Sequence, residues 1–221
     1  MSIEPSIEPS IEPSIEPLPV DESFAVPAGP EQLSRAAKGL TGRGYTAHVV
    51  DTVADARALV HELLPRDRPV FTAASMTLVE SGLMADVDDS GEFRSLRAEL
   101  AGVDPADLRA QIRLGAAPDV VLGSVHAVTE DGVLVAVSAS GSQLAPYAAG
   151  AEKVVWVVGA QKVVPDLDTA LRRVRTYSYP REHDRWRRQG AESFIGKTLI
   201  LEREFTPDRC TVVLVGEEIG Y

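Results

Sequence analysis

Residues 119–167 read DVVLGSVHAVTEDGVLVAVSASGSQLAPYAAGAEKVVWVVGAQKVVPDL, and this stretch decides the fold class. It contains three apolar runs, at 119–123, 133–138 and 154–159, separated by loops rich in Gly, Ser, Thr and single charges. Short apolar runs bounded by such loops are typical of buried strands. Open α/β sheets bind their ligands in the loops that follow the strands, so we expect the functional site in this stretch.

The remaining sequence alternates between helical and strand periodicity. Helices are predicted at 31–40, 53–63, 104–114, 143–150, 166–175 and 180–189, and further strands at 46–50, 70–72, 198–203 and 211–215. Such alternation, with near-continuous apolar strands, favours an α/β fold with an open, largely parallel sheet and helices on both faces. The strand at 133–138 and the last two strands are candidates for a small antiparallel addition.

The length and composition predict one folded domain. The chain has 221 residues, of which 44% are hydrophobic, enough for one substantial core. Residues 2–17 are four copies of Ser-Ile-Glu-Pro, a low-complexity sequence whose prolines disfavour helix and strand. We therefore predict a disordered tail at 1–28, either an acidic docking arm or a merely solvated segment, and a single domain at 29–221.

Charge and cysteine content exclude several classes of function. With 22 Lys and Arg against 33 Asp and Glu, the net charge of −11 would repel a phosphate backbone, so no nucleic-acid partner is expected. The single cysteine, Cys210, lies in an apolar run and is predicted to be a buried strand residue. No apolar run approaches the roughly 20 residues of a membrane span, and no basic, apolar leader follows Met1. We expect a cytoplasmic protein with no membrane association.

A hydroxyl-rich loop follows the predicted strand at 70–72. Thr72, Ser75 and Thr77 lie between this strand and a predicted helix start, where free backbone N–H groups favour an anion. The alternative is ordinary helix capping, because Thr77 and Glu80 have the spacing of a capping box.

Glu130 and His126 are candidates for proton transfer. Glu130 follows a buried strand and precedes the turn at Asp131-Gly132, so its carboxylate could act as an acid, base or nucleophile. The alternative is a solvated hairpin charge. His126 could be a general base, a ligand contact or a hydrogen-bonded structural residue. No second histidine lies at ligand spacing, so no metal site is expected.

Two further loops offer donors to an anion. Ser140, Gly141 and Ser142 have small side chains that let a ligand approach the backbone, although Ser142 could simply cap a helix. Gly159 ends the most apolar strand, and Lys162 three residues later could pair with a carboxylate or phosphate or remain solvated. No glycine-rich dinucleotide motif or P-loop is present, and no cofactor is expected.

The only basic cluster, at 181–188, is predicted to be a solvated helix or one that faces a second copy in a homo-oligomer. Arg and Trp are common at protein interfaces, and the cluster contains both. In the alternative interpretation, Arg181 or Arg185 contacts an anionic ligand.

Several of these blocks, taken in order, resemble the LUD domain family of lactate utilisation proteins. The resemblance spans about residues 30–221 and is found in TAASMT at 72–77, ESGL at 80–83, GSVHAVTEDG at 123–132, ASGSQL at 139–144 and WVVGAQKVVP at 156–165. It implies the α/β fold of the superfamily that includes ribose-5-phosphate isomerase, glucosamine-6-phosphate deaminase and CoA-transferases. Glu130-Asp131-Gly132 also looks like the Glu-X-Gly motif that carries the nucleophilic glutamate of class I CoA-transferases.

The resemblance implies a protein that binds a small anionic metabolite, such as a hydroxy acid or a phosphorylated derivative, in lactate or organic-acid utilisation. Glu130 and Lys162 are the candidate catalytic residues if the protein is an enzyme, which the sequence leaves open. Two alternatives remain. One is a non-catalytic accessory or regulatory subunit with oxidoreductase partner subunits. The other is a CoA-transferase-like or sugar-phosphate isomerase-like enzyme using Glu130.

Overall fold

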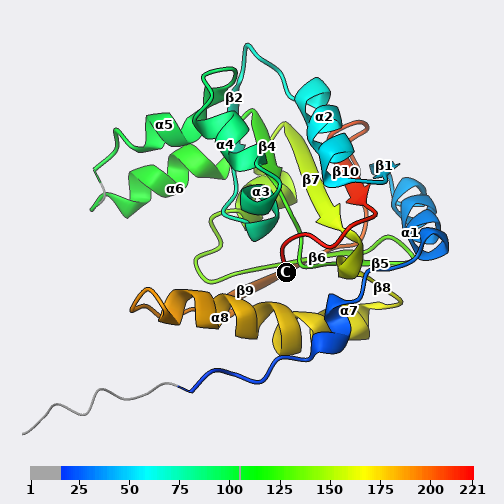
Figure 1. Ribbon diagram of the computed structural model, residues 1–221. Helices are drawn as coiled ribbons and strands as arrows, with labels where there is room; N and C mark the ends of the chain where they lie inside the picture. The colour runs from blue at the N-terminus through cyan, green and yellow to red at the C-terminus, as the bar shows by residue number, and fades with distance from the viewer. Residues whose placement is uncertain (1–15, 105) are drawn as a thin grey trace, which may run out of the picture.

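The computed structural model describes residues 16–104 and 106–221 and contains two sheets (Figure 1). The larger sheet has six strands, all parallel, in the order β1-β10-β7-β4-β2-β3. The smaller sheet is mixed, with the order β8-β5-β6-β9. The predicted α/β fold with a largely parallel sheet and a small antiparallel addition is confirmed.

The strands of the parallel sheet are β1 (Thr46–Val50), β2 (Pro69–Thr72), β3 (Arg94–Ser95), β4 (Val120–Gly123), β7 (Lys153–Gly159) and β10 (Cys210–Val215). Those of the mixed sheet are β5 (Ala127–Thr129), β6 (Leu134–Ser138), β8 (Val163–Val164) and β9 (Lys197–Leu201).

The α-helices are α1 (Pro30–Gly42), α2 (Val53–Leu63), α3 (Met76–Glu80), α4 (Leu83–Asp88), α5 (Leu96–Leu100), α6 (Leu108–Ala116), α7 (Leu167–Arg173) and α8 (Tyr179–Arg187). Short 3-10 turns form η1 (Glu22–Ala25) and η3 (Ala160–Lys162), and π-helical turns form η2 (Pro146–Gly150) and η4 (Val174–Ser178).

Strand β7 lies inside the parallel sheet and places apolar side chains on both of its faces. Val154, Trp156 and Val158 belong to the cluster between the two sheets, whereas Val155 and Val157 belong to the cluster against α2, α3 and α4. All five are fully buried, as expected for a central strand of a covered parallel sheet.

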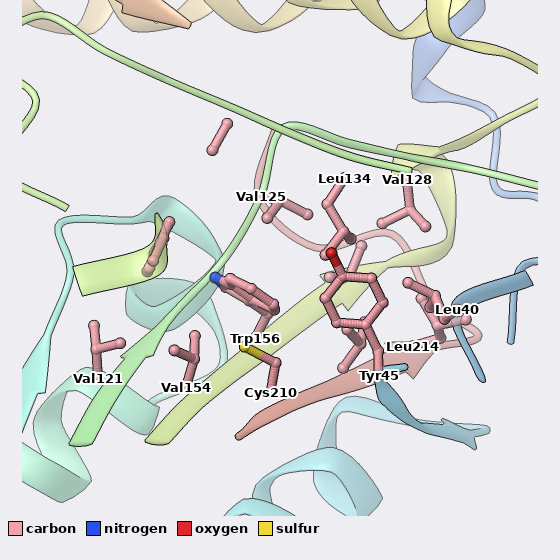
Figure 2. Packing of buried hydrophobic residues seen from close by; sticks show 14 of the residues in the cluster. Leu40, Tyr45, Val121, Val125, Val128, Leu134, Val154, Trp156, Cys210 and Leu214 are labelled. Atoms are coloured by element: carbon pink, nitrogen blue, oxygen red, sulfur yellow. The ribbon is translucent and has the colours of Figure 1, made fainter. Parts of the chain in front are cut away.

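The core between the two sheets is built around Trp156 (Figure 2). The rings of Tyr45 and Tyr147 approach Trp156 edge-on, with centroid distances of 6.3 and 5.3 Å. Val128 and Leu134 of the mixed sheet belong to the same cluster. The mixed sheet therefore covers part of the face on which sequence reasoning expected only helices.

A third cluster joins the other face of the mixed sheet to α7 and η4. Val135 and Val137 of β6 contribute to it, and so does Phe24 of the N-terminal turn η1. The backbone N–H of Asp21 also donates to the Thr176 carbonyl at 2.8 Å. The folded part of the chain therefore begins before the predicted boundary at residue 29. Residues 1–15, which hold most of the repeats, lie outside the described residues.

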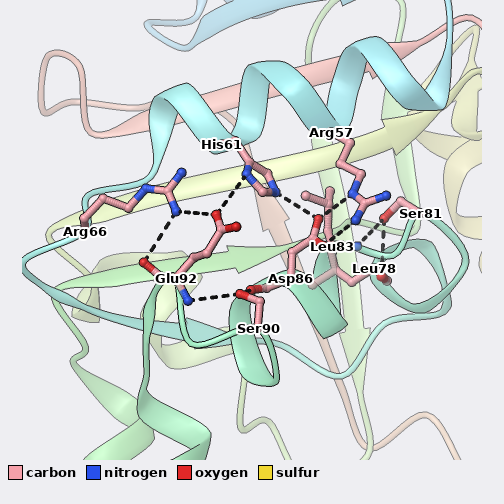
Figure 3. A network of polar contacts seen from close by, with 9 residues as sticks. All are labelled: Arg57, His61, Arg66, Leu78, Ser81, Leu83, Asp86, Ser90 and Glu92. Atoms are coloured by element: carbon pink, nitrogen blue, oxygen red, sulfur yellow. Dashed lines mark hydrogen bonds and ion pairs between the residues drawn. The ribbon is translucent and has the colours of Figure 1, made fainter.

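A polar network ties α2 to α4 and the loop after it (Figure 3). The buried carboxylate of Asp86 accepts hydrogen bonds from both Nε and Nη2 of Arg57, and Nε2 of His61 lies 2.9 Å from it. The Arg57 hydrogen bond outweighs burial, which acts in the opposite direction, and the pKa of Asp86 is lowered. Arg66 and Glu92 extend the network with an ion pair of 3.0 Å.

Several local predictions are confirmed. The helices predicted at 53–63 and 166–175 are present as α2, which Thr52 caps in a reciprocal capping box with Asp55, and as α7, which Asp166 caps and which continues into η4. Gly132 adopts a φ of 91° in the reversal between the antiparallel strands β5 and β6. Cys210 is buried in β10.

Other local predictions are wrong. The last strand, β10, is not part of the antiparallel addition but lies inside the parallel sheet between β1 and β7. The segment predicted as a helix at 143–150 is helical from Leu144 to Gly150, but its last five residues form the π-helical turn η2 instead of a regular α-helix. The helix predicted from residue 104 begins at Leu108 and is capped by Asp107. Residues 104 and 107 are both Asp, a common cap residue, and the apolar pattern alone does not show at which of the two the helix starts.

Candidate functional site

A cavity of about 660 Å³ lies at the carboxyl ends of three adjacent strands of the parallel sheet. Ser75 follows β2, Ser124 and His126 follow β4, and Lys162 follows β7, and all four line the cavity. Parallel strands end at the same sheet edge, so loops far apart in sequence meet there. The cavity is thus the kind of ligand site expected at the edge of an open α/β sheet.

The opposite wall comes from the end of β6, the loop after it, α8 and the segment that leads into β9. It contains hydroxyl and amide side chains, aromatic rings and both signs of charge. Its members include Ser138, Ser140, Ser142, Gln143, Tyr179, Glu182, Arg185, Trp186, Glu192, Phe194 and Tyr221. A ligand would therefore lie between the sheet edge and α8.

Lys162 is a buried amine at the wall of this cavity, with a relative exposure of 2%. Its Nζ donates to Thr77 Oγ1 at 2.7 Å and to Ser124 Oγ at 3.1 Å. Within the described residues, no carboxylate lies at ion-pair distance from this amine. Burial and, next, the charge of Arg173 lower the pKa of Lys162 well below its usual value, against a smaller opposite effect of Glu80.

The turn η3 holds Lys162 in place through the C-terminal segment. Gln161 Nε2 donates to the carbonyls of Ile219 and Gly220 at 3.0 and 2.8 Å. A Cβ on Gly159 would lie 2.3 Å from the Gln161 side-chain oxygen and 2.8 Å from the Ile219 nitrogen. Gly159 thus contributes by letting the C-terminal segment approach closely, and it does not itself line the cavity.

Arg173 is a second buried cation behind the cavity. Its Nε donates to the Gln161 carbonyl at 3.1 Å, and its Nη1 donates to the His126 carbonyl at 2.6 Å and to Ser178 Oγ at 2.8 Å. Its Nη2 has no hydrogen-bond partner within the described residues, and no ion pair to Arg173 is found there. Burial lowers the pKa of Arg173 to about 10. A buried guanidinium with incomplete partners is costly, so the charge favours a nearby anion.

His126 is a neutral imidazole in this environment. Its Nδ1 accepts the backbone N–H of Val137 at 3.2 Å, which places the ring proton on Nε2. Burial, reinforced by the charges of Lys162 and Arg173, lowers the pKa of His126 to about 3. Since the side chain lines the cavity, it offers a hydrogen-bond donor that stays uncharged at neutral pH.

The three hydroxyls predicted after β2 have different surroundings. Ser75 lines the cavity. Thr77 lies inside α3, not at a capping position, and contacts Lys162. Thr72 donates to Asp88 Oδ2 at 2.6 Å and accepts from Arg97 Nε at 2.7 Å, so its hydroxyl is already engaged within the fold.

In the loop after β6, Ser140 and Ser142 line the cavity, while Gly141 shapes the turn with a φ of 89°. The backbone N–H of Gly141 donates to Ser138 Oγ at 2.9 Å, and that of Ser142 donates to Ser140 Oγ at 3.3 Å. The helical residues that follow begin at Leu144, and the Ser142 hydroxyl donates to the Gln143 side-chain oxygen at 3.3 Å.

Glu130 lies outside the cavity. Its carboxylate accepts from Arg35 Nε at 2.6 Å and from Gln32 Nε2 at 3.2 Å, which ties α1 to the β5–β6 hairpin. The Arg35 hydrogen bond lowers the pKa of Glu130, against a smaller opposite effect of burial. Strand β5 separates Glu130 from His126 by four residues, roughly 13 Å of extended chain. The structure therefore does not bring Glu130 and Lys162 together.

Arg181 and Arg185 of the basic cluster at 181–188 lie in different surroundings. Arg185 lines the cavity and pairs with Glu182 at 2.7 Å, whereas Arg181 pairs with Glu22 at 2.6 Å on the N-terminal segment. Glu182 also accepts from Trp186 Nε1 at 2.6 Å and from the Tyr221 hydroxyl. Burial acts to raise the pKa of Glu182. The hydrogen bonds from Arg185, Tyr221 and Trp186 together have the larger effect, so the pKa is lowered.

Sequence reasoning missed Ser124, Arg173, Glu182 and Tyr221. Ser124 had a usable signal, since it directly follows a buried strand in a block already singled out. Arg173 shares a helical face with apolar Ala170 and Tyr177, and an arginine in such a pattern normally appears solvated.

Two features are absent from the part of the chain that is described. No group of three or more His, Cys, Asp or Glu residues there could hold a metal ion. Across the same residues, no helix combines the length and the apolar character needed to span a bilayer.

The fold and the cavity define an α/β protein with a cavity at the carboxyl edge of its parallel sheet. The chain belongs to the LUD domain family, whose family model matches residues 33–215. This family is associated with lactate utilisation. The predicted family is thus confirmed, and its superfamily placement is consistent with the fold.

Among solved structures, the chain is similar to a DUF162 family protein from Deinococcus radiodurans, with a TM-score of 0.52 and 12% sequence identity. The match covers 84% of this chain and 96% of the other. At this identity the likeness shows the fold alone. A search of curated proteins found no match.

Proposed function

We propose that this LUD-domain protein binds a small anionic metabolite, a hydroxy acid or a phosphorylated derivative, in the cavity around Lys162, as part of lactate or related organic-acid utilisation. One observation carries the proposal: Lys162 and Arg173 are both buried beside the same cavity without a carboxylate partner in the described part of the chain. An anion in the cavity would supply the missing countercharge.

The other cavity residues suit an anion as well. His126 supplies an uncharged N–H donor, and Ser75, Ser140 and Ser142 supply hydroxyls. Binding an anion would favour the ammonium form of Lys162, so binding should be linked to proton uptake. If the protein is an enzyme, the same amine would stabilise negative charge that develops on the substrate.

The alternatives differ in what supports them. A CoA-transferase-like or isomerase-like reaction at Glu130 has little support, because the Glu130 carboxylate is engaged by Arg35 outside the cavity. An accessory subunit of an oxidoreductase complex is favoured by three exposed apolar side chains that line the cavity, Val79, Trp186 and Phe194. A partner that covers them would also close the cavity.

The test is a thermal-shift and calorimetric screen with lactate, glycolate, phosphoglycolate and sugar phosphates, because a ligand of the native state must raise its melting temperature. Lys162→Met should raise the Kd by at least about tenfold, or 1.4 kcal/mol. Lys38→Met is the matched control, since Lys38 is exposed and lies outside the cavity. The proposal fails if no compound stabilises the wild type, or if Lys162→Met responds as the wild type does.

A further inference from the structure

We propose that Lys162 also reacts covalently, by condensing with the carbonyl carbon of a small 2-oxo acid to form an imine in the cavity. The inference rests on the proposed function in one respect only: a small carboxylate must be able to enter the cavity. It adds a reaction that anion binding alone does not require.

The hydrogen bonds around the amine do not require it to be charged. Nζ contacts two hydroxyls, Thr77 Oγ1 and Ser124 Oγ, and in the residues described no carboxylate holds it as an ammonium ion. Thr77 Oγ1 donates its own proton to the Ile219 carbonyl and Ser124 Oγ to the Val125 carbonyl, so both hydroxyls accept from the amine. An uncharged amine keeps two N–H groups, one for each hydroxyl, and a free lone pair. The geometry is therefore compatible with the neutral amine.

The charge behind the amine acts in the same direction. Burial lowers the pKa of Lys162, and the charge of Arg173 lowers it further. Lysines that are desolvated, or that lie beside another cation, are the ones activated as carbonyl nucleophiles. Lys162 meets both conditions, and it borders a cavity large enough to admit a small acid.

The reaction balances without an oxidant or reductant. The nitrogen lone pair attacks the carbonyl carbon, a C–N bond forms, and the nitrogen loses a proton while the carbonyl oxygen gains one. The C–O bond of this carbinolamine then breaks and one water leaves. The hydroxyls of Thr77 and Ser124 touch the nitrogen and can pass its protons. His126 supplies a further N–H donor in the same cavity.

The charge of the site selects the substrate class. A carboxylate adjacent to the carbonyl would compensate the buried charge of Arg173 and would hold the carbonyl carbon near Nζ. A neutral ketone offers the same carbonyl without that attraction, and a hydroxy acid offers the carboxylate without a carbonyl. A comparison of 2-oxo acids, neutral ketones and hydroxy acids therefore distinguishes anion binding from imine formation.

The experiment treats the full chain with pyruvate and cyanoborohydride, followed by intact mass and peptide mapping. We expect one adduct on Lys162, heavier by the mass of the acid less one oxygen atom, forming at least about tenfold faster than on an exposed lysine. Lactate should give none, and acetone much less. The chain has four lysines, so each site can be mapped separately.

Lys162→Met should abolish the adduct, whereas Lys197→Met should keep it, because Lys197 is an exposed lysine beside the Gly141 loop. A melting curve checks that both variants fold.

The adduct rate should level off at a lower pH than for N-acetyl-lysine, whose amine titrates at about 10.4. No adduct, or equal labelling of all four lysines, would overturn the inference. If pyruvate raises the melting temperature without an adduct, anion binding stands and the imine does not. If it does neither and the anion screen is also negative, both proposals fail.

Discussion

The α2–α4 network and the Lys162 cavity both keep a charged side chain away from water, but they treat its charge in opposite ways. Asp86 accepts from Arg57 and His61, so its charge is compensated within the fold. Lys162 meets only hydroxyls, and its charge is not compensated by any described residue. A compensated charge holds elements together, whereas an uncompensated one is available for a ligand.

The largest expected effect is the loss of the compensated charge. Asp86→Asn should lower the free energy of unfolding by about 2 kcal/mol, because it breaks charge-assisted hydrogen bonds to a half-exposed arginine. Urea denaturation followed by circular dichroism measures it. Glu62→Gln, which changes an exposed carboxylate on α2, the helix that carries Arg57 and His61, should change stability by less than about 0.5 kcal/mol. Equal losses of stability in both variants would contradict a stabilising role for the Asp86 charge.

The pH dependence of this difference has a defined sign. The pKa of Asp86 is lowered in the folded state, so its contribution is present above the unfolded value of about 3.9 and is lost as the pH falls through the folded value. Denaturation curves of wild type and Asp86→Asn should therefore converge below about pH 4. A difference that persists at lower pH would mean that the charge is not its source.

Lys162→Met should have a smaller effect of the opposite sign. Replacing an uncompensated buried cation by an apolar side chain of similar length should leave stability unchanged or raise it by up to about 1 kcal/mol at neutral pH. Since the folded pKa of Lys162 is lowered, the cost of its charge disappears above the unfolded value of about 10.4. The two proteins should then become equally stable. A loss of 2 kcal/mol or more at neutral pH would show that Lys162 is structural.

The smallest effect is expected at His126. With its pKa lowered to about 3, the imidazole should show no titration between about pH 5 and 8 in NMR spectra that follow its ring protons. An ordinary midpoint near 6.5 would mean that the imidazole is solvated and that its environment is not cationic.

Sequence reasoning predicted the strands around the cavity because their apolar runs are local features. The runs ending at Gly123 and Gly159 gave β4 and β7 almost to the residue. The location of β10 could not be predicted in this way. Its parallel partners, residues 46–50 and 153–159, are distant in sequence, and nothing in its own pattern identifies them.

The same contrast, between local sequence features and contacts distant in sequence, applies to the predicted site residues. Lys162, His126, Ser75, Ser140 and Ser142 line the cavity because each directly follows a strand or a strand-end turn. Glu130 also directly follows a strand, β5, but this strand leads the chain away from His126 and out of the cavity. Residues supplied by α8 depend on how that helix packs, which sequence spacing does not reveal.

The central position of β10 has a consequence for folding during synthesis. Strand β1 pairs only with β10 in the parallel sheet, so residues 46–50 have no strand neighbour until residues 210–215 have left the ribosome. Until then one edge of β7 is also unpaired, and an open apolar edge invites pairing with other chains. Folding that depends on such distant contacts is slow. We therefore expect nascent chains of this protein to associate with chaperones until the last strand inserts.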